Sequence, residues 1–151
     1  MRDELADLLD TAIYKEVATQ AFYIAGQAQT EDPGARALLK ELAKEELRHA
    51  QRLKEVREKG WQNYRWQRKR IPNLMLSEYL VDKDSLAGAG LQDTLLFAIK
   101  REQQSVEFYS RMTGVVNDEA AKSLCRRLAH EELRHKMRLE TLYDDLFYQE
   151  D

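Results

Sequence analysis

Two copies of one short motif carry the residues of this sequence that are best suited to chemistry. Glu-Glu-Leu-Arg-His occurs at residues 45–49 and again at 131–135, so each copy has a glutamate three residues before a histidine. Side chains three residues apart on a helix lie on the same side and can reach one metal ion together. Carboxylate oxygens and imidazole nitrogens both bind divalent transition metals. The motif therefore predicts two related half-sites for metal.

The motif is part of a longer internal repeat with a shift of 86 residues. Between residues 35–53 and 121–139, this shift superposes identical residues at 11 of 19 positions. The same shift, with no gap, places Glu16 on Glu102 and Tyr23 on Tyr109. The repeat therefore spans a pair of segments, and it predicts one structural unit that is built twice.

Each repeated segment has the apolar spacing of a helix, because apolar residues recur three and four apart over windows longer than a strand uses. We expect helices at about 3–29, 33–59, 91–111 and 118–148, with turn signals at Asp32, at Thr113 and Gly114, and at Asn117 or Asp118. The segment 60–90 between the hairpins is long enough to run the length of a bundle. The sequence thus predicts an all-α fold: one four-helix domain over 1–151, made of hairpins at 3–59 and 91–148 and a long crossover at about 60–90.

The repeated acidic residues are predicted to face the interior of this bundle. At 100° per residue, Glu16 and Glu102 each lie in the middle of an apolar face. The six polar residues that face the core are Glu16, Glu46, His49, Glu102, Glu132 and His135. Unpaired buried carboxylates cost several kcal/mol each, so something must neutralise four of them. Two divalent cations would balance the four negative charges, with two neutral imidazoles as further ligands.

These residues make the chain resemble the ferritin-like di-iron proteins, and within them the rubrerythrin group. The resemblance covers almost the whole chain, through two E(x)6Y patterns at 16–23 and 102–109 and two ExxH patterns. It implies a ferritin-like bundle that holds two iron ions, although manganese or a mixed pair shares these ligands. The roles that it implies are terminal ligands Glu16 and Glu102, bridging carboxylates Glu46 and Glu132, and histidine ligands His49 and His135.

Departures from the family pattern narrow what the resemblance implies. Cys125 is the single cysteine, so we expect no rubredoxin-type iron site and an external donor protein for electrons; Cys125 itself is expected to pack inertly in the core. Leu47 stands where bacterioferritin has its haem-binding methionine, so no haem is implied. Ser105 replaces an additional glutamate of rubrerythrins, which weakens the case for peroxidase activity specifically. We expect a small soluble oligomer, a homodimer, whose hairpins pair within a chain or are swapped between chains.

Three function classes follow from these residues. The favoured one is a non-haem di-iron enzyme that performs redox chemistry with peroxide or O2, as a rubrerythrin-like peroxidase or oxidase in oxidative-stress defence. The same ligands would also support a ferroxidase, or an iron or manganese handling protein without organic turnover. A metal-stabilised interaction module is the third. Tyr23 and Tyr109 could hydrogen-bond the ligand carboxylates or relay electrons.

Charge and hydropathy exclude other classes of function. No apolar run approaches the roughly 20 residues that span a bilayer, and the N-terminus carries alternating charges, so we expect a cytoplasmic protein with no membrane span. The net charge of −3 predicts no general attraction to nucleic acid. The basic and aromatic stretch 61–72 could bind an anionic partner, but we expect it to pack on the bundle. His130 is expected on the surface and is excluded as a ligand.

Overall fold

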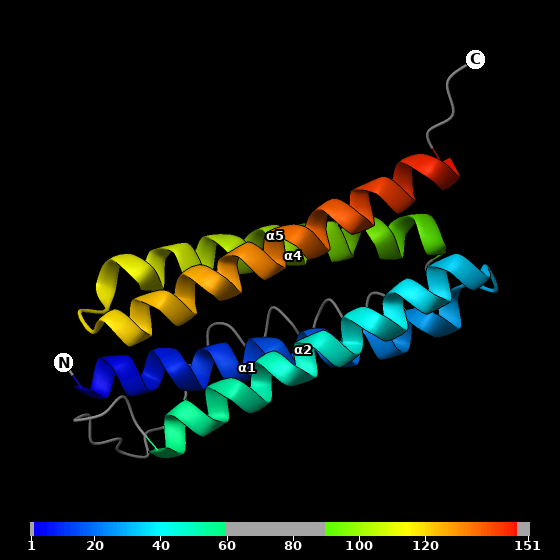
Figure 1. The fold of residues 1–151 in the computed structure, drawn as a ribbon. Coiled ribbons are helices and arrows are strands. Elements are labelled where there is room, and N and C mark those ends of the chain that lie inside the picture. Colours follow the sequence, from blue (N-terminus) through cyan, green and yellow to red (C-terminus); the bar gives the residue numbers. More distant parts are fainter. Residues whose placement is uncertain (1, 60–89, 148–151) are drawn as a thin grey trace.

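The computed structural model describes residues 2–59 and 90–147, and all of its regular structure there is helical. The elements are α1 (Arg2–Gly26), a short 3-10 turn η1 (Gln27–Gln29), α2 (Pro33–Lys59), α4 (Leu91–Val115) and α5 (Glu119–Phe147). The helices α1 and α2 form one antiparallel hairpin, and α4 and α5 form another that lies beside it (Figure 1). The predicted all-α helical bundle is confirmed. The predicted crossover and the stretch 61–72 lie outside the described residues, and the single-domain assignment stays a prediction.

The second helix of each hairpin begins at a repeat-related aspartate. The Asp32 carboxylate accepts a hydrogen bond of 2.8 Å from the backbone N–H of Ala35, and the Asp118 carboxylate accepts one of 3.0 Å from Ala121. A side-chain oxygen at this place satisfies an amide that has no partner in the first turn of a helix. Of the two caps considered for α5, Asp118 is therefore the one that the structure uses.

Helix α4 continues one turn beyond the end predicted from the sequence. Thr113 and Gly114 were expected to form the turn between α4 and α5, but both are helical and α4 ends at Val115. The Thr113 hydroxyl donates a 2.9 Å hydrogen bond to the carbonyl oxygen of Tyr109, which satisfies that side chain within the helix. Met112 is buried in the core and holds the last turn against α5. The predicted position of this turn is therefore wrong by several residues.

Among the residues that the structure describes, the hydrophobic core forms two clusters that the repeat relates to each other. One cluster contains Leu9, Ala12, Leu53, Phe108, Tyr109, Cys125 and Leu128. The other contains their counterparts 86 residues away, namely Leu95, Ala98, Leu139, Phe22, Tyr23, Leu39 and Leu42. Each cluster takes residues from both hairpins, so the hairpins are joined by apolar packing on either side of the bundle's middle. Between the two clusters lies a buried polar layer.

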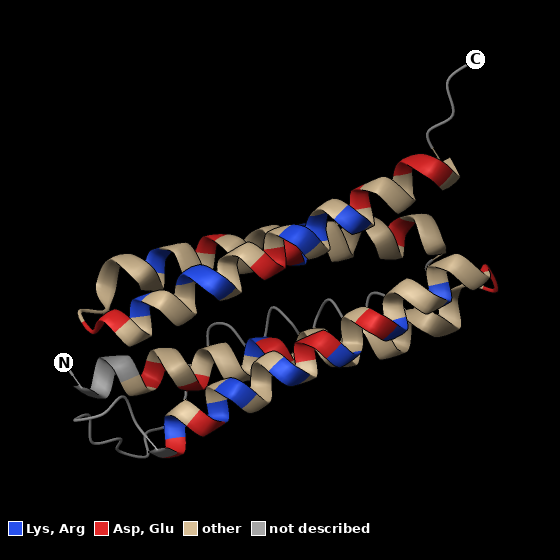
Figure 2. Cartoon of the chain, viewed as in Figure 1, with Lys and Arg blue, Asp and Glu red and all other residues tan. Residues whose placement is uncertain are grey.

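The outer surface of the described helices carries both signs of charge. Lysine and arginine alternate with aspartate and glutamate along α2 and α5 (Figure 2). Among the described residues, no helix is both long enough and apolar enough to cross a membrane.

Candidate metal centre

Six buried side chains from all four long helices meet in the middle of the bundle. Two groups could each hold a metal ion: Glu16, Glu46, His49 and Glu132 form one, and Glu46, Glu102, Glu132 and His135 form the other. Within each group the candidate ligand atoms all lie within 4.8 Å of one another. Glu46 and Glu132 belong to both groups. The structure therefore brings together all six residues that the sequence placed in the core.

The contacts within the two groups follow the same pattern. His49 Nδ1 lies 3.1 Å from an oxygen of Glu46 and 3.3 Å from an oxygen of Glu16. His135 Nδ1 lies 3.0 Å from Glu132 and 3.5 Å from Glu102. The two imidazole rings are nearly parallel, with an interplanar angle of 9° and centroids 5.8 Å apart. The repeat in the sequence is thus a repeat in the geometry of the site.

The pattern of unsatisfied atoms at the centre fits a pair of metal ions. One oxygen of Glu16, one of Glu102, both of Glu46, both of Glu132 and Nδ1 of each histidine are buried without a hydrogen-bond partner among the described residues. Buried polar atoms normally have partners, because leaving one unsatisfied costs about 1–3 kcal/mol. Two free oxygens suit a carboxylate that bridges two ions, and one suits a terminal ligand. The residues therefore fit the metal pair that their chemistry implies.

Each terminal glutamate is held by a tyrosine of the opposite hairpin. The Tyr109 hydroxyl donates a hydrogen bond to Glu16, and the Tyr23 hydroxyl donates one to Glu102. Burial, followed by the negative charge of the neighbouring glutamates, raises the pKa of both tyrosines well above 10. Both phenols therefore stay protonated and act as donors near neutral pH. The sequence suggested that the tyrosines could bond ligand carboxylates without indicating which ones, and each hydrogen bond runs between the two hairpins.

The first glutamate of each motif contacts the histidine of the other motif. His49 Nε2 lies 2.7 Å from Glu131, and His135 Nε2 lies 2.8 Å from Glu45. An ionised carboxylate only accepts hydrogen bonds, so Nε2 carries the hydrogen in each pair and Nδ1 faces the centre. Glu45 and Glu131 are both partly exposed. They nevertheless orient the imidazoles, because the histidines reach across between hairpins.

When no cation is bound, the charges of the buried glutamates raise the pKa values of their neighbours at this centre. Burial, with the charges of Glu102 and Glu16, raises the pKa of Glu46 and Glu132 well above the usual range. Burial alone would lower the pKa of His49, but its contact with the charged carboxylate of Glu16 outweighs burial and raises this pKa to about 9. Burial would also lower the pKa of His135, but its contacts with the carboxylates of Glu102, Glu132 and Glu46 outweigh burial and raise this pKa. Protons thus offset part of the charge that cations would neutralise.

Glu16 differs from the bridging glutamates in the direction of its pKa. Burial acts to raise the pKa of Glu16, but its contact with the positive charge of His49 outweighs burial and leaves this pKa lowered. Glu16 therefore stays ionised beside a protonated His49.

Sequence reasoning missed a buried cation next to each terminal glutamate. Lys15 and Arg101 are each 1% exposed and are related by the repeat. Lys15 Nζ lies 5.1 Å from the ring centroid of Phe108, and the Arg101 guanidinium lies 5.0 Å from that of Phe22. Arg101 also donates a 3.2 Å hydrogen bond to the Thr19 hydroxyl. The signal available in the sequence was the positive charge that the repeat keeps at both places.

Two further residues lie where the sequence predicted them. Cys125 is buried in the core, and burial raises its thiol pKa to about 11, so it is protonated and unreactive at neutral pH. His130 is exposed and belongs to neither candidate metal group.

Comparison with known families agrees with this geometry. A family model described as Rubrerythrin matches residues 93–151. The predicted rubrerythrin resemblance is confirmed over this part of the chain. The rubrerythrin match covers nearly all of the second hairpin, including Glu102, Glu132 and His135. The first hairpin, which supplies the repeat-related Glu16, Glu46 and His49, lies outside this match. The match supports a di-iron protein in general.

One solved structure has the same fold over almost the whole chain. A hypothetical protein from Pyrococcus furiosus is 25% identical, with a TM-score of 0.68, and the alignment covers 93% of this chain and 88% of that one. No curated protein matches the chain significantly. The likeness supports the bundle, and the rubrerythrin match supports the chemistry of the centre.

Proposed function

We propose that this protein holds two iron ions at the buried centre and carries out redox chemistry with peroxide or O2. The observation that carries the proposal is the pair of four-residue groups that share Glu46 and Glu132. Glu16 and His49 would hold one ion and Glu102 and His135 the other, with the shared carboxylates between them. Iron bound there would supply electrons to the oxidant, and an external donor protein would restore them.

The chain's own residues orient the predicted ligands and bury them. Tyr23 and Tyr109 each engage one oxygen of a terminal glutamate and leave the other oxygen free. Glu45 and Glu131 hold the histidine rings by their outer nitrogens. The two apolar clusters pack against the polar layer from either side, and each of the six predicted ligands is at most 5% exposed. Such fixed surroundings lower the reorganisation that a change of charge at the centre requires.

The direct test is anaerobic titration of the purified chain with ferrous iron, followed by peroxide. We expect about two iron ions per chain, and oxidation of the bound iron that depends on peroxide and repeats when a reductant is supplied. The same protein loaded with zinc serves as the control, because zinc takes these ligands without redox chemistry.

Two results would count against this function. A stoichiometry of about one ion per chain or fewer would contradict a dinuclear centre. Two ions that are oxidised once, with no turnover when a reductant is added, would favour the ferroxidase or metal-handling alternative.

The carboxylates that hold the histidines give a second prediction. Glu131→Ala should lower iron affinity by about tenfold or more, because partners of this kind typically contribute that much to a metal site. Glu131→Gln should lose less, since its amide oxygen still accepts the hydrogen bond from His49. Competition with a chelator of known affinity would measure both, with the exposed Glu119→Ala variant as the control. Equal affinities in all three variants would show that Glu131 does not support His49.

A further inference from the structure

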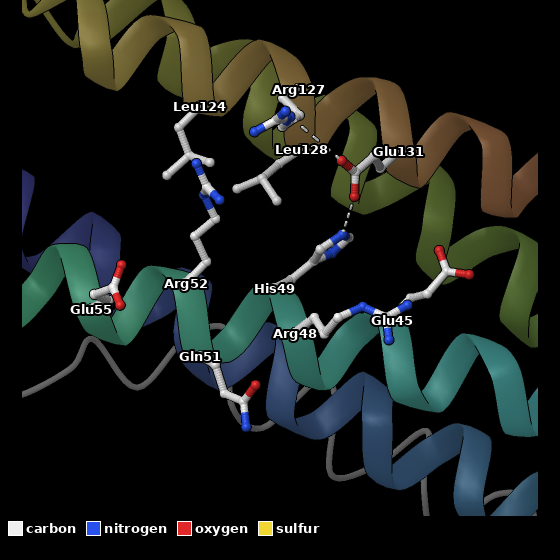
Figure 3. Close-up of a pocket in the computed structure, with 10 residues that line it drawn as sticks. All are labelled: Glu45, Arg48, His49, Gln51, Arg52, Glu55, Leu124, Arg127, Leu128 and Glu131. Atoms are coloured by element: carbon white, nitrogen blue, oxygen red, sulfur yellow. Dashed lines mark hydrogen bonds and ion pairs between the residues drawn. The ribbon is translucent and has the colours of Figure 1, made fainter.

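A surface cavity of about 500 Å³ opens between α2 and α5 beside His49 (Figure 3). Three arginines line it: Arg48 and Arg52 from α2, one turn apart, and Arg127 from α5. Glu45, Glu55 and Glu131 also line it, so the three arginines are matched in number by three carboxylates. Their partners, rather than their number, decide what the cavity can bind. We call this cavity the arginine pocket.

The carboxylates of the arginine pocket are all engaged. Glu131 contacts His49 at 2.7 Å and Arg127 at 3.9 Å, and Glu45 contacts His135 at 2.8 Å. Glu55 also has an interaction partner. In contrast, no hydrogen bond or ion pair engages Arg48 or Arg52 within residues 2–59 and 90–147. Two guanidinium groups in the pocket therefore keep their donors free.

The other half of the repeat shows how an arginine at this position can be paired with a carboxylate. Arg138 is the counterpart of Arg52, and its two terminal nitrogens lie 3.1 and 3.0 Å from the two oxygens of Glu41. This is the paired geometry that guanidinium and carboxylate groups favour. The repeat counterpart of Glu41 is Arg127. Arg138 is thus paired with a carboxylate of the chain itself, whereas Arg52 has a second cation, Arg127, at the equivalent position.

We propose that the arginine pocket binds a small organic acid, whose carboxylate lies between Arg52 and Arg127 as Glu41 lies against Arg138. The fork of Arg52 is free to take both oxygens of such a group, and Arg48 adds a second free cation one turn away. The arginines that would hold this carboxylate are not metal ligands, and occupancy of the pocket does not require iron. The pocket is next to the centre, because His49 and Glu131 form part of its wall.

Succinate is a suitable probe, and calorimetric titration of the full chain, with and without bound metal, would detect it. We expect saturable binding of one succinate per chain with a dissociation constant in the millimolar range, in buffers whose ionic strength is matched with potassium chloride. The double variant Arg48→Gln, Arg52→Gln should bind at least about tenfold more weakly. Arg134→Gln changes the exposed repeat counterpart of Arg48 outside the pocket and should bind as the unaltered protein does.

A second variant tests the comparison between the two halves. Arg127→Glu places a carboxylate at the counterpart of Glu41, so it should pair with Arg52 and abolish succinate binding. Arg126→Glu makes the same charge change on an exposed neighbour outside the pocket, and it should retain binding within about threefold. Retention of helical structure by circular dichroism would show that the variants fold.

Three outcomes would overturn the proposal. Heat that tracks ionic strength without saturation would mean that no site exists. Undiminished binding by the double variant, or by Arg127→Glu, would place the site elsewhere. Inorganic phosphate that binds at least tenfold more tightly than succinate would overturn the assignment of the ligand as a carboxylate.

Discussion

Replacing Glu46 or Glu132 with alanine should remove both metal ions from the centre, whereas replacing His49 or His135 should remove mainly one. Each of these glutamates belongs to both candidate groups and has both oxygens free, while each histidine belongs to one group. We expect bound iron to fall from about two per chain to near zero in the glutamate variants, and to about one in the histidine variants. Iron analysis after anaerobic loading and desalting measures this directly.

Loss of metal must be distinguished from loss of the fold in this series. Removal of a buried carboxylate relieves repulsion when no cation is bound, so Glu46→Ala and Glu132→Ala should keep their helices. Circular dichroism of each variant checks this expectation. Glu119→Ala makes the same charge change on an exposed side chain of α5 and should bind two ions. If Glu132→Ala retains two ions while Glu131→Ala loses them, the ligand in each motif is the preceding glutamate.

The two histidine variants also test the internal symmetry. The contacts of His49 and His135 match within the centre, so the two variants should bind similar amounts of iron. The surroundings of the two histidines differ outside the metal centre. His49 borders the arginine pocket, whereas His135 is held by Glu45, and Glu45 lies 3.6 Å from Arg138. A difference in the rate of iron uptake with equal stoichiometry would therefore report on access from the pocket.

Helical periodicity was sufficient to predict which residues meet at the centre. Glu16 and Glu102 lie among leucines at positions that only a buried face explains, and the repeat places an ExxH pair opposite each of them. Residue type was sufficient to predict where α2 and α5 begin, because the side chains of Asp32 and Asp118 can accept a hydrogen bond from the first turn of a helix. These are local properties of one helix, and the sequence records them directly.

Contacts between the hairpins could not be predicted in the same way. A helical wheel gives the direction of Tyr23 but not the residue that it meets, and its hydrogen bond goes to Glu102 instead of to Glu16. For the same reason a helical wheel does not show that His49 contacts the partly exposed Glu131 of the other hairpin. The end of α4 was missed because Thr113 and Gly114 read as a turn, while the packing of Met112 extends the helix. Tertiary packing decided each of these features.

One difference between the two halves of the repeat has a larger structural effect than their shared motif would suggest. Arg127 stands where its counterpart is Glu41, and this single difference of charge separates an arginine pocket with free donors from a closed ion pair. Alignment of the two halves reveals the difference only after the structure shows that Arg138 meets Glu41. Internal repeats are thus informative at the positions where their halves differ.

Without bound metal, the protein should become less stable as pH rises from 6.5 to 9, and the benefit of metal should grow over the same range. The pKa of His49 is raised from 6.5 to about 9, so its protonation stabilises the fold fully below pH 6.5 and is lost as pH rises through 9. His135, Glu46 and Glu132 have raised pKa values and act in the same direction. The lowered pKa of Glu16 acts oppositely, but only at acidic pH below its usual value of 4.5.

The size of this effect makes it measurable by thermal unfolding. His49 alone corresponds to roughly 3 kcal/mol between pH 6.5 and 9, and the melting temperature of metal-free protein should fall by roughly 10 °C. Metal takes the ligands in their deprotonated forms, so protein loaded anaerobically with manganese should lose much less stability over this range. His49→Gln should remove much of the dependence, and His130→Gln, which changes an exposed histidine, should keep it. A metal-free protein that is equally stable at both pH values would show that His49 is not held among ionised carboxylates.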